Sequence, residues 1–269
     1  MKKKIKFRWS WQSVSTILYP VVFGIILLLL WQTQILHKLL GTDTFTLPLP
    51  GRIVNIILDN EASVMKNVNA TLIVAVGGLL CGSVFGYLLG VIATVFPKWG
   101  AGGLSIASAI SAIPIIAIAP ILNNLTKDFS DDANVRSMLA KTIVVMITCT
   151  VSMSINAYRG LNELKPFSLD LMRSYAASKW TVFMKLRIPN SVPYIFIALR
   201  VSVPASIISA LVSEYFAEYI IGVGRQIREN IVLAQYSTAW AYIVVACAMG
   251  ILMYGILLVT EGIVLKGRK

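Results

Sequence analysis

The sequence predicts an all-α integral membrane protein with six transmembrane helices, and three observations support this fold class. Of its 269 residues, 57% are hydrophobic and 13% are charged, and the mean hydropathy is +0.77, which is too apolar for a water-soluble domain. Long apolar runs recur, and most approach the ~20 residues that a helix needs to cross ~30 Å of hydrocarbon. Basic residues gather in segments that alternate with these runs. The runs cover residues 17–31, 72–96, 104–122, 138–157, 192–215 and 239–264.

The charge distribution predicts the topology. A net charge of +12 could indicate a nucleic-acid partner, but most of the 24 lysines and arginines fall on the side of the membrane that holds the N-terminus. The carboxylates favour the other side, so the basicity reflects orientation, and we predict no nucleic-acid partner and two cytoplasmic termini. A basic segment, residues 1–16, suits anionic membrane lipid, and a membrane domain with a long inner loop at 159–191 fills residues 17–269.

The side chains that familiar hydrolytic or metal chemistry requires are missing. Cys81, Cys149 and Cys247 lie in three different apolar runs, and His37 is the only histidine. No Cys-x-x-Cys pair, histidine metal cluster or Ser/His/Asp triad can be assembled from this set. We therefore predict no catalytic residue, no metal and no cofactor, which also excludes an intramembrane hydrolase.

The first half of the chain has recognisable helix and turn signals. The first run is expected to be a retained helix, because no small-residue cleavage site follows it. Prolines at 48 and 50 then break the chain, and apolar residues at helical spacing over 53–65 predict an amphipathic helix on the outer surface. In the second run, glycines recur every fourth residue and predict a close-packing ridge, within the subunit or between subunits. These glycines are Gly78, Gly82, Gly86 and Gly90.

The inner loop at 159–191 contains both cations and apolar side chains. Ser168 is expected to cap a short helix that ends near Ala177, with Asp170 in its first turn. A second helix is expected from Lys179 until Pro189 stops it, with Trp180 and Phe183 on one face. Exposed apolar surface of this kind usually marks a protein interface.

The loop also carries a motif that resembles a known family. Permease subunits of bacterial ABC importers have the pattern E-A-A-x-x-x-G, then nine residues, then I-x-L-P. Here Asp170 stands at the acid, Ala176 at the glycine, and Leu186, Ile188 and Pro189 at the last three defined positions, while Leu and Met replace the two alanines. Further stretches, including the one around Pro114 and Pro120, are similar to the nitrate, sulfonate and taurine subgroup, and within it to thiamine-pyrimidine or riboflavin uptake permeases.

The resemblance implies a type I ABC importer-like fold in which the loop is a coupling helix seated on a separate ATPase. The chain lacks the G-x-x-x-x-G-K-[ST] phosphate-binding loop, so ATP hydrolysis falls to partner ATPase subunits. A solute-binding protein outside and a second permease chain, expected to form a homodimer, complete the system. The solute would be a vitamin precursor such as a pyrimidine or riboflavin, or a sulfonate or nitrate-like anion. The implied coupling residues are Asp170, Tyr175, Ala176, Ala177, Ser178, Lys179, Trp180, Phe183 and Pro189.

Charged and polar groups within the spans are candidates for the translocation path or gate, because dehydrating them is costly. Glu214 and Glu218 could line the path, pair with Arg225 or Arg228, or sit at the membrane interface. Arg200 could snorkel inward, act as a counter-ion or touch solute, while Asn123 and Ser206 could contact solute or bond to their own helix. A proton-coupled secondary transporter that titrates Glu214 or Glu218 is the alternative function. The path candidates are Pro114, Pro120, Asn123, Arg200, Ser206, Glu214 and Glu218.

Overall fold

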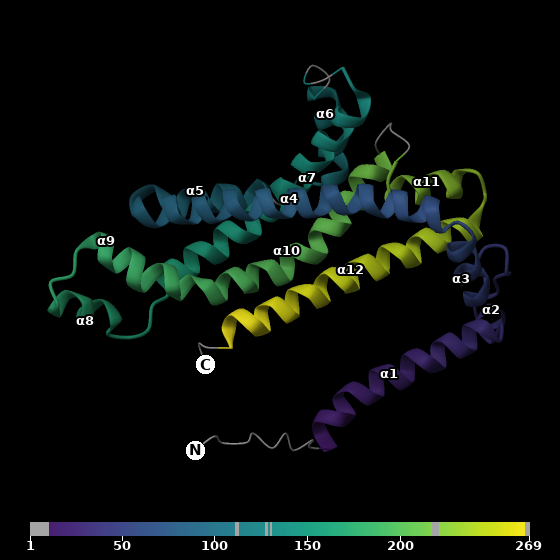
Figure 1. Cartoon of the computed structure of the whole chain (residues 1–269), viewed down its shortest axis with the longest axis horizontal. Helices are drawn as coiled ribbons and strands as arrows, with labels where there is room; N and C mark the ends of the chain where they lie inside the picture. Colours follow the sequence, from purple (N-terminus) through teal and green to yellow (C-terminus); the bar gives the residue numbers. More distant parts are fainter. Residues whose placement is uncertain (1–10, 111–112, 127–128, 130, 217–220, 267–269) are drawn as a thin grey trace.

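The described part of the chain is entirely helical. The computed structural model describes residues 11–110, 113–126, 129, 131–216 and 221–266, and Figure 1 shows its helices arranged as a bundle with one outlying arm. The helices are α1 Trp11–Gln32, α2 Ile35–Leu40, α3 Pro50–Asp59, α4 Glu61–Val95, α5 Pro97–Ile110, α6 Ile115–Leu125, α7 Ala133–Asn162, α8 Ser168–Ser174, α9 Lys179–Val182, a π-helical turn Phe183–Arg187, α10 Ile188–Phe216, α11 Val223–Val232 and α12 Tyr236–Leu265.

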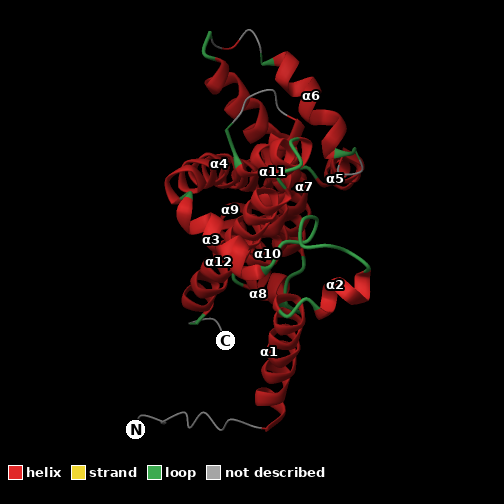
Figure 2. Cartoon of the chain, turned by 90° about the vertical axis from the view of Figure 1, so that its right-hand side faces the viewer, coloured by secondary structure: helices red, strands yellow, loops and turns green. Residues whose placement is uncertain are grey.

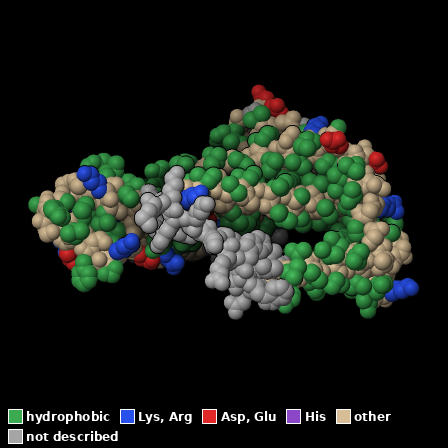
Figure 3. Space-filling model, turned by 60° about the horizontal axis from the view of Figure 1, so that its bottom comes forward, with side chains coloured by type: hydrophobic (Ala, Val, Ile, Leu, Met, Phe, Trp, Pro, Cys, Tyr) green, Lys and Arg blue, Asp and Glu red, His purple; other side chains and the backbone are tan. Residues whose placement is uncertain are grey.

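Four helical segments of the described residues are long and apolar enough to cross a membrane. They are Glu61–Val95, Asn134–Asn162, Lys179–Phe216 and Tyr236–Leu265, and each contains one of the predicted runs. Figure 3 shows hydrophobic side chains over much of the helical surface, with charged groups toward the ends. A water-soluble bundle has polar side chains over its outer surface, so the distribution seen here suits a surface that faces lipid.

The third apolar run, residues 104–122, was expected to form one span, but it forms parts of two separate helices. The run divides into α5, of 14 residues, and α6, of 11 residues, each too short to span hydrocarbon alone. Pro114 stands immediately before α6 with extended backbone angles, φ −61° and ψ 125°. A proline disfavours helical geometry in the residue before it and lacks the N–H that would continue the helix, which explains the separation. Pro120, by contrast, lies inside α6.

The glycine ridge of α4 is a packing face within the subunit. It lies against α7, and a Cβ atom added to Gly82 or Gly86 would come within 2.5 Å of the carbonyl oxygen of Met146 or Thr150. Gly78 and Gly90 are similarly close to α7. Small residues permit this backbone approach, which stabilises helix pairs in lipid, so the predicted close-packing role is confirmed.

Helix α1 lies apart from the bundle in both views (Figures 1 and 2), and it packs mainly on α2 and α3. Its 22 residues approach the length of a membrane span, although the apolar helix within it is shorter, Leu18–Gln32. Gln34, with φ 62°, separates α1 from α2. The amphipathic helix predicted for 53–65 ends earlier, at Asp59, where Asn60 separates α3 from α4; Ile53 is its buried contact.

Candidate coupling loop and polar sites in the membrane helices

The loop between α7 and α10 projects from one end of the molecule as two short helices, α8 and α9 (Figure 1). The C-terminus of α8 has the bond pattern of a Schellman motif, since Ala176 N–H donates to Arg173 O at 2.9 Å and Ala177 N–H to Met172 O at 3.0 Å. This motif requires a left-handed residue, usually glycine, and Ala176 supplies it with φ 48°. The tight turn of the family pattern therefore forms here with alanine at the glycine position.

The predicted serine cap of α8 is absent, whereas α9 has a serine cap. Ser168 does not cap α8: its hydroxyl donates to Lys165 O at 2.7 Å, and Phe167, with φ 62°, precedes the helix. Asp170 in the first turn pairs with exposed Arg173 at 3.3 Å. Ser178 caps α9 instead, accepting a hydrogen bond from Thr181 N–H at 3.2 Å.

Pro189 does not stop the second loop helix, contrary to the prediction. The π-helical turn Phe183–Arg187 joins α9 to α10, so the helix is continuous from Lys179 to Phe216. Within it, Ile188 N–H donates to Phe183 O, five residues back rather than four. Such a widened turn provides room for the ring of Pro189, which would clash with a carbonyl of a regular α-helix.

Aromatic side chains of the loop are exposed at the end of the molecule. Phe167, Tyr175 and Trp180 are 81%, 77% and 69% exposed, and the Trp180 ring stacks on half-buried Phe183 with centroids 6.4 Å apart. Lys179 is exposed beside them. The combination of exposed rings and a basic rim fits a protein interface.

Hydrogen bonds fasten the base of this loop to the end of α7. Arg187 donates from Nη1 to Leu161 O at 2.9 Å and to Asn162 Oδ1 at 2.8 Å. Asn190 Nδ2 donates to Gly160 O at 2.7 Å, and Tyr194 OH donates to Glu163 Oε2 at 3.0 Å. The loop is therefore anchored to α7 as well as to α10, of which it is the N-terminal continuation.

Glu214, near the far end of α10, is buried at 1% exposure and binds the start of α11. Its Oε2 accepts hydrogen bonds from Gly224 N–H and from Thr71 Oγ1, both at 2.9 Å. Thr71 Oγ1 in turn accepts from Val223 N–H at 2.9 Å. The carboxylate thus meets the amide groups and the positive dipole end of α11, a favourable arrangement for a buried anion.

Other groups complete this junction of four helices. Asn67 Oδ1 accepts from Gly222 N–H at 2.9 Å, and its amide donates to Ser63 O at 2.8 Å. Gly222 has φ 127°, and a Cβ atom there would lie 2.3 Å from the carboxyl carbon of Glu214. The ion pairs between described residues do not join Glu214 to Arg225 or Arg228, which was one of the alternatives, and the guanidinium of Arg228 lies over the ring of Tyr215.

Arg200 pairs with Glu261, a partner that was not predicted from the sequence. Its Nε and Nη2 donate to Oε2 and Oε1 of Glu261 on α12, both at 2.8 Å. This two-bond geometry is the strongest form of an arginine–carboxylate pair and agrees with the counter-ion alternative. An ionisable residue at 261, inside an apolar run, was the signal available in the sequence.

The remaining path candidates are dispersed. Ser206 is buried and its hydroxyl donates to Val203 O at 2.8 Å, so it bonds to its own helix. Pro114 and Pro120 are exposed at the start of α6 and within it, and α6 packs on α7 and α10. Asn123 belongs to α6, but its side chain is outside the described set, and Glu218 lies outside the described residues. The structure therefore does not unite these candidates in one site.

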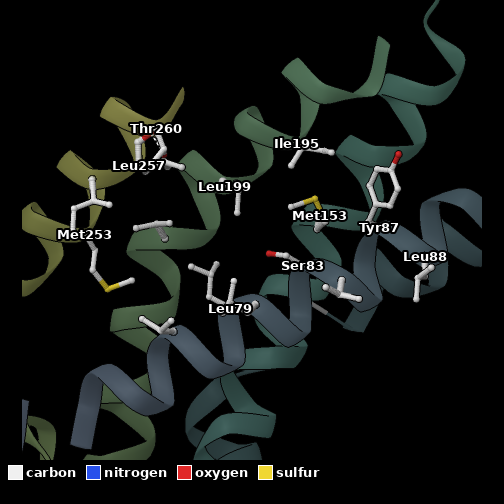
Figure 4. Close-up of a pocket in the computed structure, with 15 residues that line it drawn as sticks. Leu79, Ser83, Tyr87, Leu88, Met153, Ile195, Leu199, Met253, Leu257 and Thr260 are labelled. Carbon is white, nitrogen blue, oxygen red and sulfur yellow. Dashed lines mark hydrogen bonds between the residues drawn. The ribbon is translucent and has the colours of Figure 1, made fainter. Parts of the chain in front are cut away.

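An apolar cavity of about 620 Å³ opens between α4, α7, α10 and α12 (Figure 4). Its lining includes Leu79, Leu199 and Met253, with few polar groups such as Ser83 and Thr260. It offers little hydrogen bonding to a polar solute, so its chemistry suits hydrocarbon rather than solute.

Comparison with known proteins defines the class of this chain. Residues 63–264 match the family described as binding-protein-dependent transport system inner membrane component, and the chain belongs to that family. It is a permease subunit of an ABC importer and a multi-pass protein of a bacterial inner membrane family. The members are non-catalytic membrane subunits that operate with ATPase and solute-binding partners, so this assignment replaces the proton-coupled alternative.

Two relatives are similar along much of their length. The formylaminopyrimidine transport permease protein ThiX of Halalkalibacterium halodurans is 26% identical over 253 residues, which cover 94% of this chain and 96% of that protein. A probable ABC transporter permease protein of Haemophilus influenzae is 25% identical over 199 residues, covering 74% of this chain and 77% of that protein.

Proposed function

We propose that two copies of this chain form the membrane half of an importer, with a path for a small solute between them. Each copy crosses the membrane six times, with α1 as the first crossing and the α5–α6 pair as the third. This arrangement leaves both termini in the cytoplasm, and it agrees with the distribution of basic residues. The basic segment 1–16 then lies against anionic lipid, and residues 17–269 form the permease domain.

The coupling role of the loop at 159–191 is supported above all by the exposed aromatic rings of Tyr175 and Trp180. They lie on short helices whose base is hydrogen-bonded to α7. The surface docks an ATPase subunit through apolar contact, and Ala176 and Ala177 keep the turn small. Asp170, Ser178 and Pro189 shape the helices behind it, and Lys179 and Phe183 flank the contact.

A pull-down with the partner ATPase tests this surface. Tyr175→Asp and Ala176→Asp place a charge in the apolar contact and should release the ATPase while the permease still reaches the membrane. Phe129→Asp is the matched control, since Phe129 is 75% exposed and lies outside the loop. Full ATPase retention by both loop variants would contradict the docking role.

The solute proposal rests on the ThiX relative, which is named for formylaminopyrimidine transport. We propose a related small heteroaromatic solute, a pyrimidine or flavin vitamin precursor, ahead of a sulfonate or nitrate. Binding assays on the partner solute-binding protein with formylaminopyrimidine, riboflavin, taurine and nitrate would identify the class. Selective binding of taurine or nitrate would contradict it.

A further inference from the structure

A second cavity, of about 270 Å³ and lined by both apolar and polar side chains, lies at the end of the bundle opposite the coupling loop. It is bounded by α4, α7, the end of α10 and Ile221. Its volume is below the ~300–1,000 Å³ usual for pockets that bind drug-sized ligands. Its polar lining consists of Asn69, Asn134, Ser137, Lys141 and Glu214, with Lys66 at the exposed side.

Lys141 is the unexpected group in this cavity, since it is only 4% exposed yet sits in a membrane helix. An ammonium group can donate three hydrogen bonds, but among the described residues Lys141 has one partner, Ile221 O at a long 3.4 Å. The ion pairs found within 4.0 Å in the described chain do not include Lys141. A buried cation with spare donors is costly unless something else satisfies it.

Two further groups in the cavity have unused hydrogen-bonding capacity. The hydrogen bonds that Glu214 accepts from described residues both end on Oε2, so Oε1 has lone pairs available for another donor. Ser137 Oγ is buried and has no partner in the described part of the chain. Donors and acceptors therefore face one small space from two different helices.

We propose that this cavity is a solute-binding step of the translocation path, and that Lys141 and Glu214 contact the solute there. Lys141 donates to a ring nitrogen or carbonyl oxygen of the solute, and Glu214 Oε1 accepts from an exocyclic amine, with Ser137 alongside. The inference rests on the proposed import function and deepens it.

The hydrogen-bonding groups favour a heteroaromatic solute that has both donors and acceptors. Lys141 and Glu214 have opposite charge and offset each other in the buried part of the cavity, and Lys66 lies at its exposed side. Nitrate, and any sulfonate without an amino group, lacks a donor for Glu214 Oε1, whereas an aminopyrimidine carries both a donor and acceptors on one planar ring. The described residues that line the apolar cavity beside Leu199 include no charged side chain.

Protection from thiol labelling tests the location. Asn134→Cys, which lines the cavity without being a proposed solute contact, is introduced into a chain with Cys81, Cys149 and Cys247 changed to alanine, and the whole complex is reacted with N-ethylmaleimide. Formylaminopyrimidine, delivered with its binding protein, should slow labelling at least fivefold, while taurine and nitrate should not. If Asn134→Cys fails to assemble, Asn69→Cys serves in its place. Equal labelling with and without formylaminopyrimidine would overturn the site, and protection by taurine or nitrate alone would overturn the solute class.

Uptake by proteoliposomes tests the role. Lys141→Met should raise the KM for formylaminopyrimidine import at least tenfold while ATPase binding is retained. Lys38→Met, which removes the same charge from an exposed position on α2, should leave the KM unchanged. An unchanged KM in Lys141→Met would overturn this site while leaving the import function intact. Absence of ATP-dependent uptake of any tested solute by the wild-type complex would instead overturn the import function.

Discussion

Gly224 N–H donates to Glu214 Oε2 at 2.9 Å, so α11 begins on a carboxylate that belongs to the preceding membrane helix. The same oxygen also binds Thr71 of α4, 143 residues earlier in the chain. Glu214 thus holds three helices at one point, and its charge offsets the amide dipoles of α11. Because of this contact, a structural role for Glu214 has to be tested together with its proposed role in the translocation path.

Glu214→Gln keeps the shape of the side chain and removes its charge. The charge-assisted bonds to Gly224 and Thr71 weaken, at a cost of about 2 kcal/mol. We expect ATPase binding to survive and uptake to fall several-fold, measured with the assembled complex. Wild-type uptake rates in Glu214→Gln would remove this residue from the transport mechanism.

Gly222→Ala should prevent the junction from forming. A Cβ at this position would lie 2.3 Å from the Glu214 carboxyl carbon, and φ 127° is unfavourable for any residue with a side chain. The yield of folded protein in detergent should fall severalfold by size-exclusion chromatography. Gly250→Ala, where nothing lies within 4 Å, is the control and should fold normally.

Gly82→Leu and Gly86→Leu test the contact between α4 and α7. A leucine cannot fit where a single Cβ already meets backbone 2.5 Å away, so both variants should lose several kcal/mol and fold poorly. Gly255→Leu in α12 has open space around it and should keep the wild-type yield. Normal assembly of the α4 variants would refute the close packing.

Ala176→Gly should stabilise the loop. Ala176 holds φ 48°, a conformation that costs an L-residue about 1 kcal/mol and glycine little. The change should raise the protease resistance of the α8–α9 segment without reducing ATPase binding. Ala177→Gly, next to it at negative φ, gains no such relief and should not become more resistant. Lower resistance in Ala176→Gly would show that the left-handed turn is not strained.

The Arg200–Glu261 pair predicts non-additive effects. Glu261→Met leaves a guanidinium in an apolar helix without its carboxylate and should lower the thermal stability of the protein, although only modestly because Arg200 is half exposed. Adding Arg200→Met should recover part of that loss. Thermal unfolding of the two single variants and the double variant measures the coupling, and strictly additive shifts would contradict it.

The sequence predicts features that depend on local pattern and length. Four membrane helices follow from long apolar runs, and the packing ridge follows from the spacing of Gly78, Gly82, Gly86 and Gly90. The positions of Tyr175 and Trp180 on short loop helices also follow from local signals.

Features that depend on partners distant in the sequence could not be predicted in this way. Glu214 was a candidate because it is charged, but its bond to Thr71 depends on how α4 and α10 pack. Pro189 was read as a helix stop because the local rule does not anticipate a π-helical turn that makes room for it. The run around Pro114 was read as one span, because an apolar run alone does not distinguish a helix that bends at a proline from one that breaks there.

The unbroken helix from Lys179 to Phe216 has a mechanical consequence. At 1.5 Å per residue, Glu214 lies about 39 Å along the axis from Ile188, just past the π-helical turn. A tilt of about a tenth of a radian at that turn would displace Glu214 by about 4 Å. If the ATPase moves the aromatic rings as proposed, this helix would act as a lever with Trp180 on its short arm and the α11 junction at the end of its long arm. A small displacement of the rings would then become a larger one beside the proposed solute cavity.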